Sequence, residues 1–139
     1  MEKVLLDTDI LSESLKRIDR RVTSKAIAYL TVFGRYTISV VTILEVVKGW
    51  HKLGREDKIQ QFFAHIAVAE VLTLKLSDAE LAGRIYADLE RTGQPIGLAD
   101  AIIAAIAIQQ DLTLVSGNLS HYQRIQALGY SLKLDNWRT

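Results

Sequence analysis

Short apolar segments alternate with longer amphipathic segments along the whole 139-residue sequence, and this alternation limits the folds that the chain can adopt. Continuous apolar runs of this length are typical of strands that are covered on both faces. We therefore expect an α/β fold in three layers, with a central, mostly parallel sheet of four or five strands and helices on both faces. The predicted strands are residues 3–7, 36–41, 71–76 and 112–116, and residues 130–134 are the candidate fifth strand, at an edge.

The helices are predicted from apolar spacing and from residues that begin or end helices. Thr42 with Glu45 three residues later, and Ser77 with Glu80, both match the capping-box pattern. Glycines then end several of the helical segments. The predicted helices are residues 10–18, 24–34, 42–54, 56–67, 77–93, 98–110 and 118–129.

Composition excludes several classes of protein. No linker-like stretch interrupts the alternation, so residues 1–139 are expected to form a single domain. The absence of Cys excludes disulfides and thiolate metal sites, and it favours a reducing cytoplasm as the compartment. The apolar stretch at the start is too short for a signal peptide, and no run approaches the roughly 20 residues of a membrane span. The net charge of +1 identifies no partner, so function has to be inferred from particular side chains.

Acidic and polar side chains follow the strands in a pattern that points to one site. Asp7 ends the first strand, Glu45 lies in the first turn of the helix after the second strand, and Asp100 opens an apolar helix. Ser116 and Asn118 follow the fourth strand. Ligands of parallel sheets bind beyond the carboxyl ends of the strands. We therefore expect these side chains to share one crevice.

Each of these residues also has a purely structural interpretation. Asp100 can stabilise a helix N-terminus, Glu45 can complete a capping box, and Asn118 can cap the last helix. Asp9 is expected to cap the helix that begins near it. Asp7 is harder to explain in this way, because a carboxylate at the end of a buried strand must be solvated, paired or neutralised by a cation.

A cluster of carboxylates favours a hard divalent cation. Mg²⁺ or Mn²⁺ takes oxygen ligands and keeps several waters, so two or three carboxylates are enough to hold it. Zinc is disfavoured because the chain lacks Cys, and His51, His65 and His121 have no paired spacing. We interpret the three histidines as surface or interface residues. The chemistry natural to such a cation site is phosphodiester hydrolysis.

Four segments together resemble a known family. The segments LLDTDILSE, ISVVTILEVVKG, PIGLADAIIAAIAI and LTLVSGNLSHYQRI are similar, in order and spacing, to the motif blocks of PIN-domain ribonucleases, and most similar to those of the VapC toxins. The resemblance implies a Mg²⁺- or Mn²⁺-dependent endoribonuclease that a cognate VapB-like antitoxin neutralises. It also implies that Asp7, Glu45 and Asp100 are catalytic, with Asp7 and Asp100 as metal ligands.

The chain departs from the family pattern at three places. Asp9 stands where the family usually has Asn, and Asn118 stands where a fourth acid is common. Ser116 and Gly117 replace the usual Thr-Arg, which removes an expected basic contact to RNA. We assign Asn118, Asp9 and Ser116 to supporting or fourth-position roles around the metal.

Two other functions fit parts of the sequence. DTDIL resembles the nucleophile motif of haloacid-dehalogenase-like phosphatases, but Leu11 stands where that motif has Thr or Val. A catalytically degenerate PIN domain that only binds RNA or protein is the other alternative. Trp50 and the segment 59–66 place large apolar side chains on helices, and from these we predict both a homodimer and a groove for an antitoxin helix.

Overall fold

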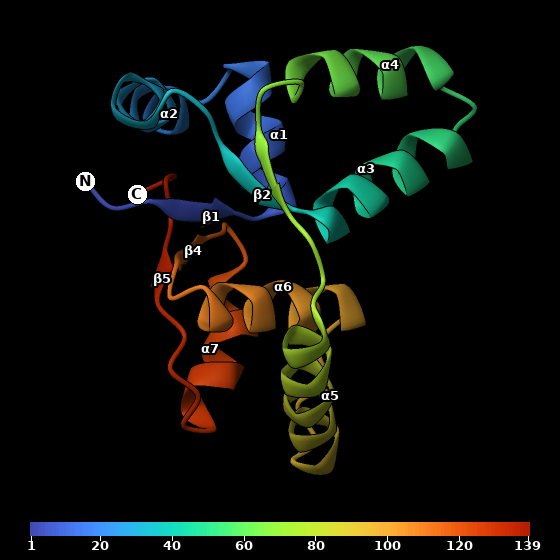
Figure 1. Cartoon of the computed structure of the whole chain (residues 1–139), viewed down its shortest axis with the longest axis vertical. Helices are drawn as coiled ribbons and strands as arrows, with labels where there is room; N and C mark the ends of the chain where they lie inside the picture. Colours follow the sequence, from blue (N-terminus) through green and yellow to red (C-terminus); the bar gives the residue numbers. More distant parts are fainter.

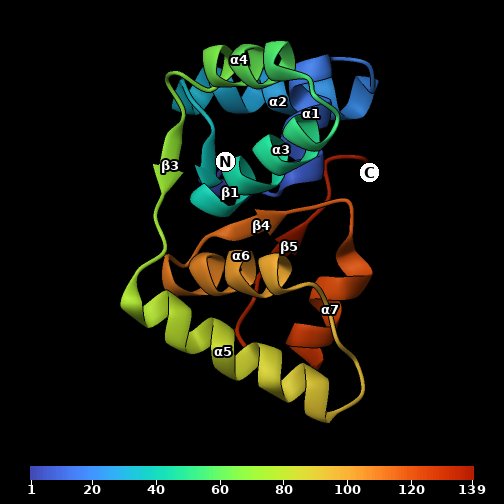
Figure 2. The same ribbon diagram turned by 90° about the vertical axis from the view of Figure 1, so that its right-hand side faces the viewer.

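The computed structural model describes all 139 residues and confirms the α/β class. Three layers are visible in Figure 1 and Figure 2, with the strands between two groups of helices. The strands are β1 (Val4–Leu6), β2 (Thr37–Ser39), β3 (Glu70–Leu72), β4 (Thr113–Val115) and β5 (Leu134–Asp135). The helices are α1 (Thr8–Lys16), α2 (Arg20–Phe33), α3 (Val40–Lys52), α4 (Glu56–His65), α5 (Leu76–Arg91), α6 (Leu98–Gln109) and α7 (Leu119–Ala127).

All strand pairs are parallel, as the alternation predicts, but the strands form two sheets instead of one. One sheet has the order β1-β4-β5 and the other pairs β2 with β3. β1 and β2 lie next to each other without a shared ladder of hydrogen bonds. The strands are only two or three residues long, so each ladder is short. The fifth strand is Leu134–Asp135, later than the predicted segment 130–134.

The alternation of side chains along the central strands builds two cores, one on each side of the strand layer. Leu5 and Leu114 pack with α5 and α6, whereas Leu6 and Val115 pack with α1 and α2. This is the two-residue period of a strand covered on both faces. Leu5 is fully buried, and its replacement by Ala would cost about 2–5 kcal/mol of folding free energy.

Several helices begin earlier than predicted: α1 begins at Thr8 instead of residue 10, α2 at Arg20 instead of residue 24, and α3 and α5 also begin one or two residues early. The N-cap of α3 is Ser39, whose Oγ accepts a hydrogen bond from the Thr42 amide at 3.3 Å. Thr42 is therefore buried inside the first turn, and the predicted capping box with Glu45 does not form. In α5 the Asp78 carboxylate accepts from the Lys75 amide at 2.9 Å, in place of a box built on Ser77. In both cases several polar residues stand near the helix start, and the residue whose side chain makes the capping bond is not the predicted one.

None of the helices combines the length and the apolar character that crossing a membrane requires.

Candidate active site

The carboxyl ends of β1 and β4 define the edge where the site lies. β1 and β4 pair in register, with Leu6 opposite Val115, so the residues that follow them, Asp7 and Ser116, are neighbours. The Asp7 amide continues the ladder by donating to the Val115 carbonyl at 2.9 Å. The structure therefore brings the first acid and the end of β4 together, as the sequence predicts.

Asp7 is the buried centre of this edge. Its Oδ1 accepts from the Thr8 amide at 2.9 Å, which makes Asp7 the N-cap of α1 and corrects the expectation that Asp9 caps this helix. Its Oδ2 accepts from the Ser116 hydroxyl at 2.8 Å. Burial, with the nearby charge of Asp9 as a smaller cause, raises the pKa of Asp7 to about 6 from an ordinary 3.8. The ionised form of this carboxyl group is therefore destabilised, because no cationic side chain compensates its charge.

Tyr122, which is not among the predicted site residues, joins two of the acids. Its hydroxyl lies 2.9 Å from Asp7 Oδ2 and 3.2 Å from Asp100 Oδ1. Burial and the two carboxylates raise the pKa of Tyr122 far above its ordinary value, so the phenol stays protonated and donates. One signal was available in the sequence: Tyr122 lies one helical turn after Asn118, on the helix that leaves β4.

His121 lies beside the outer oxygen of Asp100, and Asn118 contacts His121. His121 Nδ1 lies 3.3 Å from Asp100 Oδ2 and 2.9 Å from the Asn118 side-chain amide nitrogen. The ring nitrogen can accept from the amide when neutral or donate to the carboxylate when protonated. Asn118 occupies the N-cap position of α7 but its side chain makes no capping bond. The alternative interpretation of Asn118 as a helix cap is therefore wrong. His121, predicted to be a surface or interface residue, lies next to Asp100.

Glu45 reaches the same edge through Thr8. The Thr8 hydroxyl lies 2.6 Å from Glu45 Oε1 and 3.1 Å from the Thr42 hydroxyl. Because a hydroxyl carries one proton, the short contact identifies Glu45 as its acceptor. Glu45 therefore does not contact Asp7 directly: Thr8 lies between them and contacts both.

Asp9 lies on the other side of Asp7. Its Oδ1 accepts from the Ile10 amide at 2.7 Å and its Oδ2 accepts from the Gly117 amide at 3.0 Å. Arg138 Nη2 lies 3.5 Å from the same Oδ2. Arg138 is not among the predicted site residues, and it lies 129 positions after Asp9 in the chain.

The donor set is made of oxygen atoms and fits a hard cation. No three Asp, Glu, His or Cys side chains converge closely enough to enclose an ion by themselves. Asp7 and Asp100, however, approach one shared hydroxyl. Two carboxylates completed by water are a normal arrangement for Mg²⁺ or Mn²⁺.

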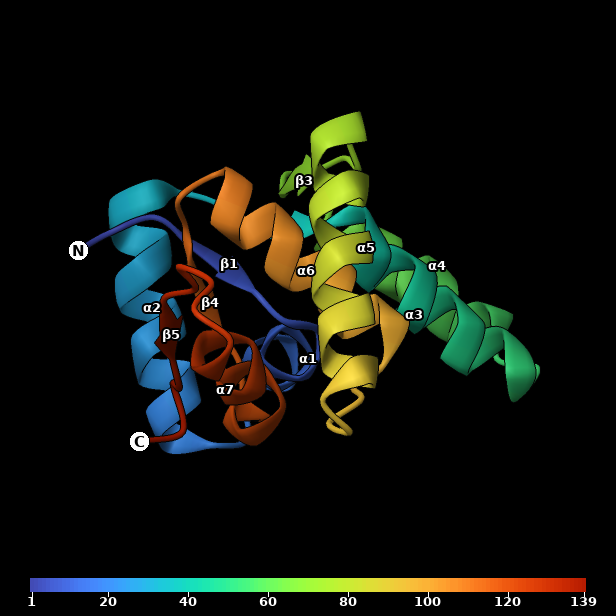
Figure 3. The same cartoon turned by 90° about the horizontal axis from the view of Figure 1, so that it is seen from below.

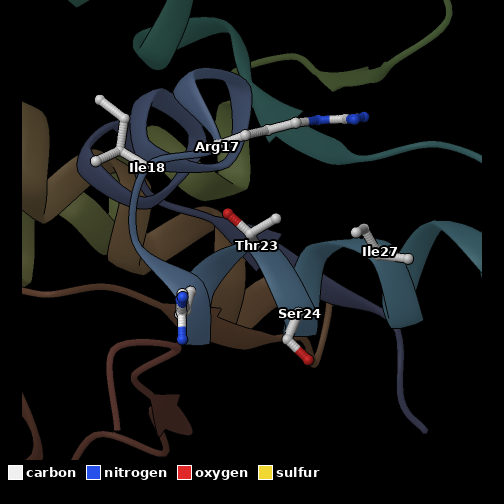
Figure 4. A pocket seen from close by; sticks show the side chains of 6 residues that line it. Arg17, Ile18, Thr23, Ser24 and Ile27 are labelled. Carbon is white, nitrogen blue, oxygen red and sulfur yellow. The ribbon is translucent and has the colours of Figure 1, made fainter.

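A separate hollow lies between α1 and α2 and contains none of these acids. Its volume is about 360 Å³, and Figure 4 shows Arg17, Ile18 and Thr23 around it. The hollow lacks carboxylates and has two cationic residues, Arg17 and Arg20, in its wall. The candidate active site is therefore the acidic edge.

Comparisons with known proteins agree with this geometry. The PIN domain family model matches residues 4–126. The chain is 30% identical to Ribonuclease VapC2 of Haemophilus influenzae, and the match covers 99% of each protein. It is 28% identical to the tRNA(fMet)-specific endonuclease VapC of Salmonella typhimurium, again over 99% of each.

Solved structures give the same fold. The crystal structure of DNA-bound VapBC from Salmonella typhimurium matches with a TM-score of 0.81 and 28% identity, over 99% of both chains. VapBC2 from Rickettsia felis matches with a TM-score of 0.80 at 23% identity, over 98% of this chain and 99% of that one. Because the PIN domain model matches residues 4–126, the alternative of a haloacid-dehalogenase-like phosphatase is wrong. The chain belongs to the PIN-domain family and, within it, to the VapC ribonucleases.

Proposed function

We propose that the chain is a Mg²⁺- or Mn²⁺-dependent endoribonuclease that acts as the toxin of a toxin–antitoxin pair. The observation that carries the proposal is the convergence of the Asp7 and Asp100 carboxylates on the Tyr122 hydroxyl, in a chain of the VapC family. Like charges brought together in a buried place are costly unless a cation neutralises them. A metal-dependent phosphodiesterase needs such a pair.

The residues of the edge have distinct roles in this proposal. Asp7 and Asp100 hold the cation, which when bound would stabilise negative charge on a phosphoryl oxygen. Tyr122 and Ser116 donate to Asp7 Oδ2 and fix the direction of that carboxylate. Glu45 is the third catalytic acid, oriented by Thr8.

Asp9 and Asn118 support this centre from either side. Asp9 is held by the Gly117 amide, and Asn118 lies next to His121. An amide at position 118 adds no charge, so we expect it to act on the metal through hydrogen bonds.

The names of the relatives suggest which RNA to test first. Two of them, from Salmonella typhimurium and Shigella flexneri, are named tRNA(fMet)-specific endonucleases. We propose initiator tRNA as the first substrate to test for this chain. Ribosomal RNA and messenger RNA are the comparison substrates in the same assay.

This chain has a groove between α1, α3 and α4 that is suitable for binding an antitoxin. Trp50, Val46 and Phe62 line this hollow of about 180 Å³, and Lys16 and Lys58 flank it. Apolar side chains with a cationic border suit an amphipathic helix that carries acidic residues. VapB-like antitoxins are the expected occupants, since the structural neighbours are VapBC complexes. The homodimer and the cytoplasmic location stay predictions.

Sequencing of RNA ends in cells after brief induction tests the proposal. We expect new ends at a defined site in one RNA class with the wild type and none with Asp7→Asn. Co-expression of the cognate antitoxin should suppress these ends. An unchanged RNA profile, with the wild type folded and free of antitoxin, would favour the degenerate binding module instead.

A further inference from the structure

The last residues of the chain are fixed beside the acidic edge. Trp137 is buried and its ring centroid lies 5.7 Å from that of Tyr29 on α2. The Arg138 carbonyl accepts from Arg21 Nη1 at 2.9 Å, and the Arg138 amide donates to Asn136 Oδ1 at 2.9 Å. Figure 3 shows the C-terminus ending next to α2. The backbone of Arg138 is therefore held on both sides.

The Arg138 side chain lies over Gly117, the residue between Ser116 and Asn118. A Cβ atom added to Gly117 would overlap the Arg138 guanidinium and would lie 2.7 Å from Asp9 Oδ2. The guanidinium thus occupies the space in which a side chain at position 117 would begin. The basic group that the sequence lacks at position 117 is supplied here from the C-terminus.

Arg138 is the only Lys or Arg that forms an ion pair with an acid of the site. It contacts Asp9, and its Nε donates to Glu13 Oε1 at 2.8 Å. Asp7, Glu45 and Asp100 have no Lys or Arg partner. Nη1 of Arg138 has no acceptor in the protein, and 37% of the side chain is exposed. The two N–H groups of Nη1, which lies against Gly117, therefore have no protein acceptor and can donate to an anion.

We propose that Arg138 binds an RNA phosphate next to the bond that is cleaved, with Glu13 holding the guanidinium in position. This inference rests on the proposed ribonuclease function. The acidic edge repels the RNA backbone, so a cation in reach of it lowers the cost of bringing a phosphate to the carboxylates. Arginine suits the task because its planar fork makes charge-assisted hydrogen bonds to phosphate.

Steady-state cleavage by purified wild type and Arg138→Ala tests this role. We expect KM to rise about tenfold while kcat stays within about twofold, as for a contact made equally in the ground and transition states. The slope of log affinity against log salt should become shallower by about 0.7, the value for one phosphate contact on a single strand. Arg138→Lys should show an intermediate KM because it keeps charge but loses the fork.

Arg55→Ala is the matched control. Arg55 also forms an ion pair, with Asp57 at 2.8 Å, but it lies at the turn between α3 and α4. Its removal lowers the net charge by the same amount. We expect the KM and the salt slope of Arg55→Ala to match those of the wild type. If both change as much as in Arg138→Ala, the effect is due to net charge alone, which would overturn the proposal.

Glu13→Gln separates a phosphate contact from a structural ion pair. Glutamine keeps an oxygen that accepts from Arg138 Nε but removes the competing charge. The proposal predicts equal or tighter RNA binding in this variant. If the pair only anchors the C-terminus, Glu13→Gln and Arg138→Ala should lower the melting temperature alike and leave KM unchanged, which would overturn the proposal.

Moving the guanidinium is the complementary test. Gly117→Arg combined with Arg138→Gly places the cation on the neighbouring chain segment and removes the overlap described above. We expect KM of the double variant to return to within about threefold of the wild type. A KM as high as that of Arg138→Ala would count against a phosphate contact at this position.

A binding measurement with a 2′-O-methyl RNA in chelator tests the Arg138 contact independently of the proposed ribonuclease function. Such an RNA lacks the free 2′-hydroxyl, and binding requires neither metal nor cleavage. Weaker binding by Arg138→Ala than by Arg55→Ala would support the contact even if the wild type cleaves nothing. Equal binding by the two variants would overturn it, even if the wild type is an active ribonuclease.

Discussion

Replacing Asp7 with Asn should stabilise the metal-free protein at high pH. The folded-state pKa of Asp7 is about 6 and its ordinary value is 3.8. Between these values the folded state binds more protons than the unfolded state, so stability falls as pH rises from about 4 to about 6. A difference of this size corresponds to about 3 kcal/mol at pH values above both pKa values.

Part of that gain is lost to other effects of the substitution. Asn caps helices about as well as Asp, and its amide can donate to the hydroxyl oxygens of Ser116 and Tyr122. The lost charge at the N-terminus of α1 costs about 0.5–1 kcal/mol. We therefore expect Asp7→Asn to be more stable than the wild type by about 1–2 kcal/mol at about pH 8.

Urea unfolding in chelator at several pH values measures this difference. The advantage of Asp7→Asn should vanish below about pH 3, where the wild-type carboxyl is largely protonated in both the folded and the unfolded state. Glu90→Gln is the control, because Glu90 is exposed and forms no ion pair or side-chain hydrogen bond. Mg²⁺ should then stabilise the wild type and leave Asp7→Asn unaffected. A variant less stable than the wild type at every pH would refute the reasoning.

Substitutions at three further positions test the metal site and the antitoxin groove. Tyr122→Phe removes the hydroxyl between Asp7 and Asp100, so we expect about a 10- to 100-fold loss of metal affinity by calorimetry with the fold retained by circular dichroism. Asn118→Asp should tighten metal binding, and Asn118→Ala should lower cleavage by about 10- to 100-fold. Identical metal affinities and cleavage rates in the wild type and these two variants would leave Asn118 without a catalytic role. Trp50→Ala should weaken antitoxin binding by about tenfold or more in a titration while RNA cleavage by the free toxin is unchanged.

The sequence predicts the parts of the fold that depend on local periodicity. The apolar runs around Leu5 and Leu114 are buried strands, and Asp7 and Asp100 approach one hydroxyl at the predicted edge of the sheet. The start of α3 was less predictable, because Ser39 and Thr42 can both cap a helix and both are fully buried. The hydrogen bond from the Thr42 amide to the Ser39 hydroxyl identifies Ser39 as the N-cap.

Long-range contacts account for what the sequence does not reveal. Tyr122 belongs to an amphipathic helix, and nothing local indicates that its hydroxyl points at two carboxylates instead of simply filling the core. Arg138 meets Glu13 across almost the whole chain. Its position depends on the burial of Trp137, and no local spacing encodes that contact.

Cleavage of RNA by the purified, antitoxin-free protein as a function of Mg²⁺ tests the central claim most directly. The account predicts cleavage that rises to saturation with Mg²⁺ and stops in excess chelator. It also predicts no cleavage by Asp100→Asn at any Mg²⁺ concentration, although that variant folds. Undiminished cleavage by the wild type in chelator, or by Asp100→Asn in Mg²⁺, would contradict the assignment of Asp7 and Asp100 as the metal site.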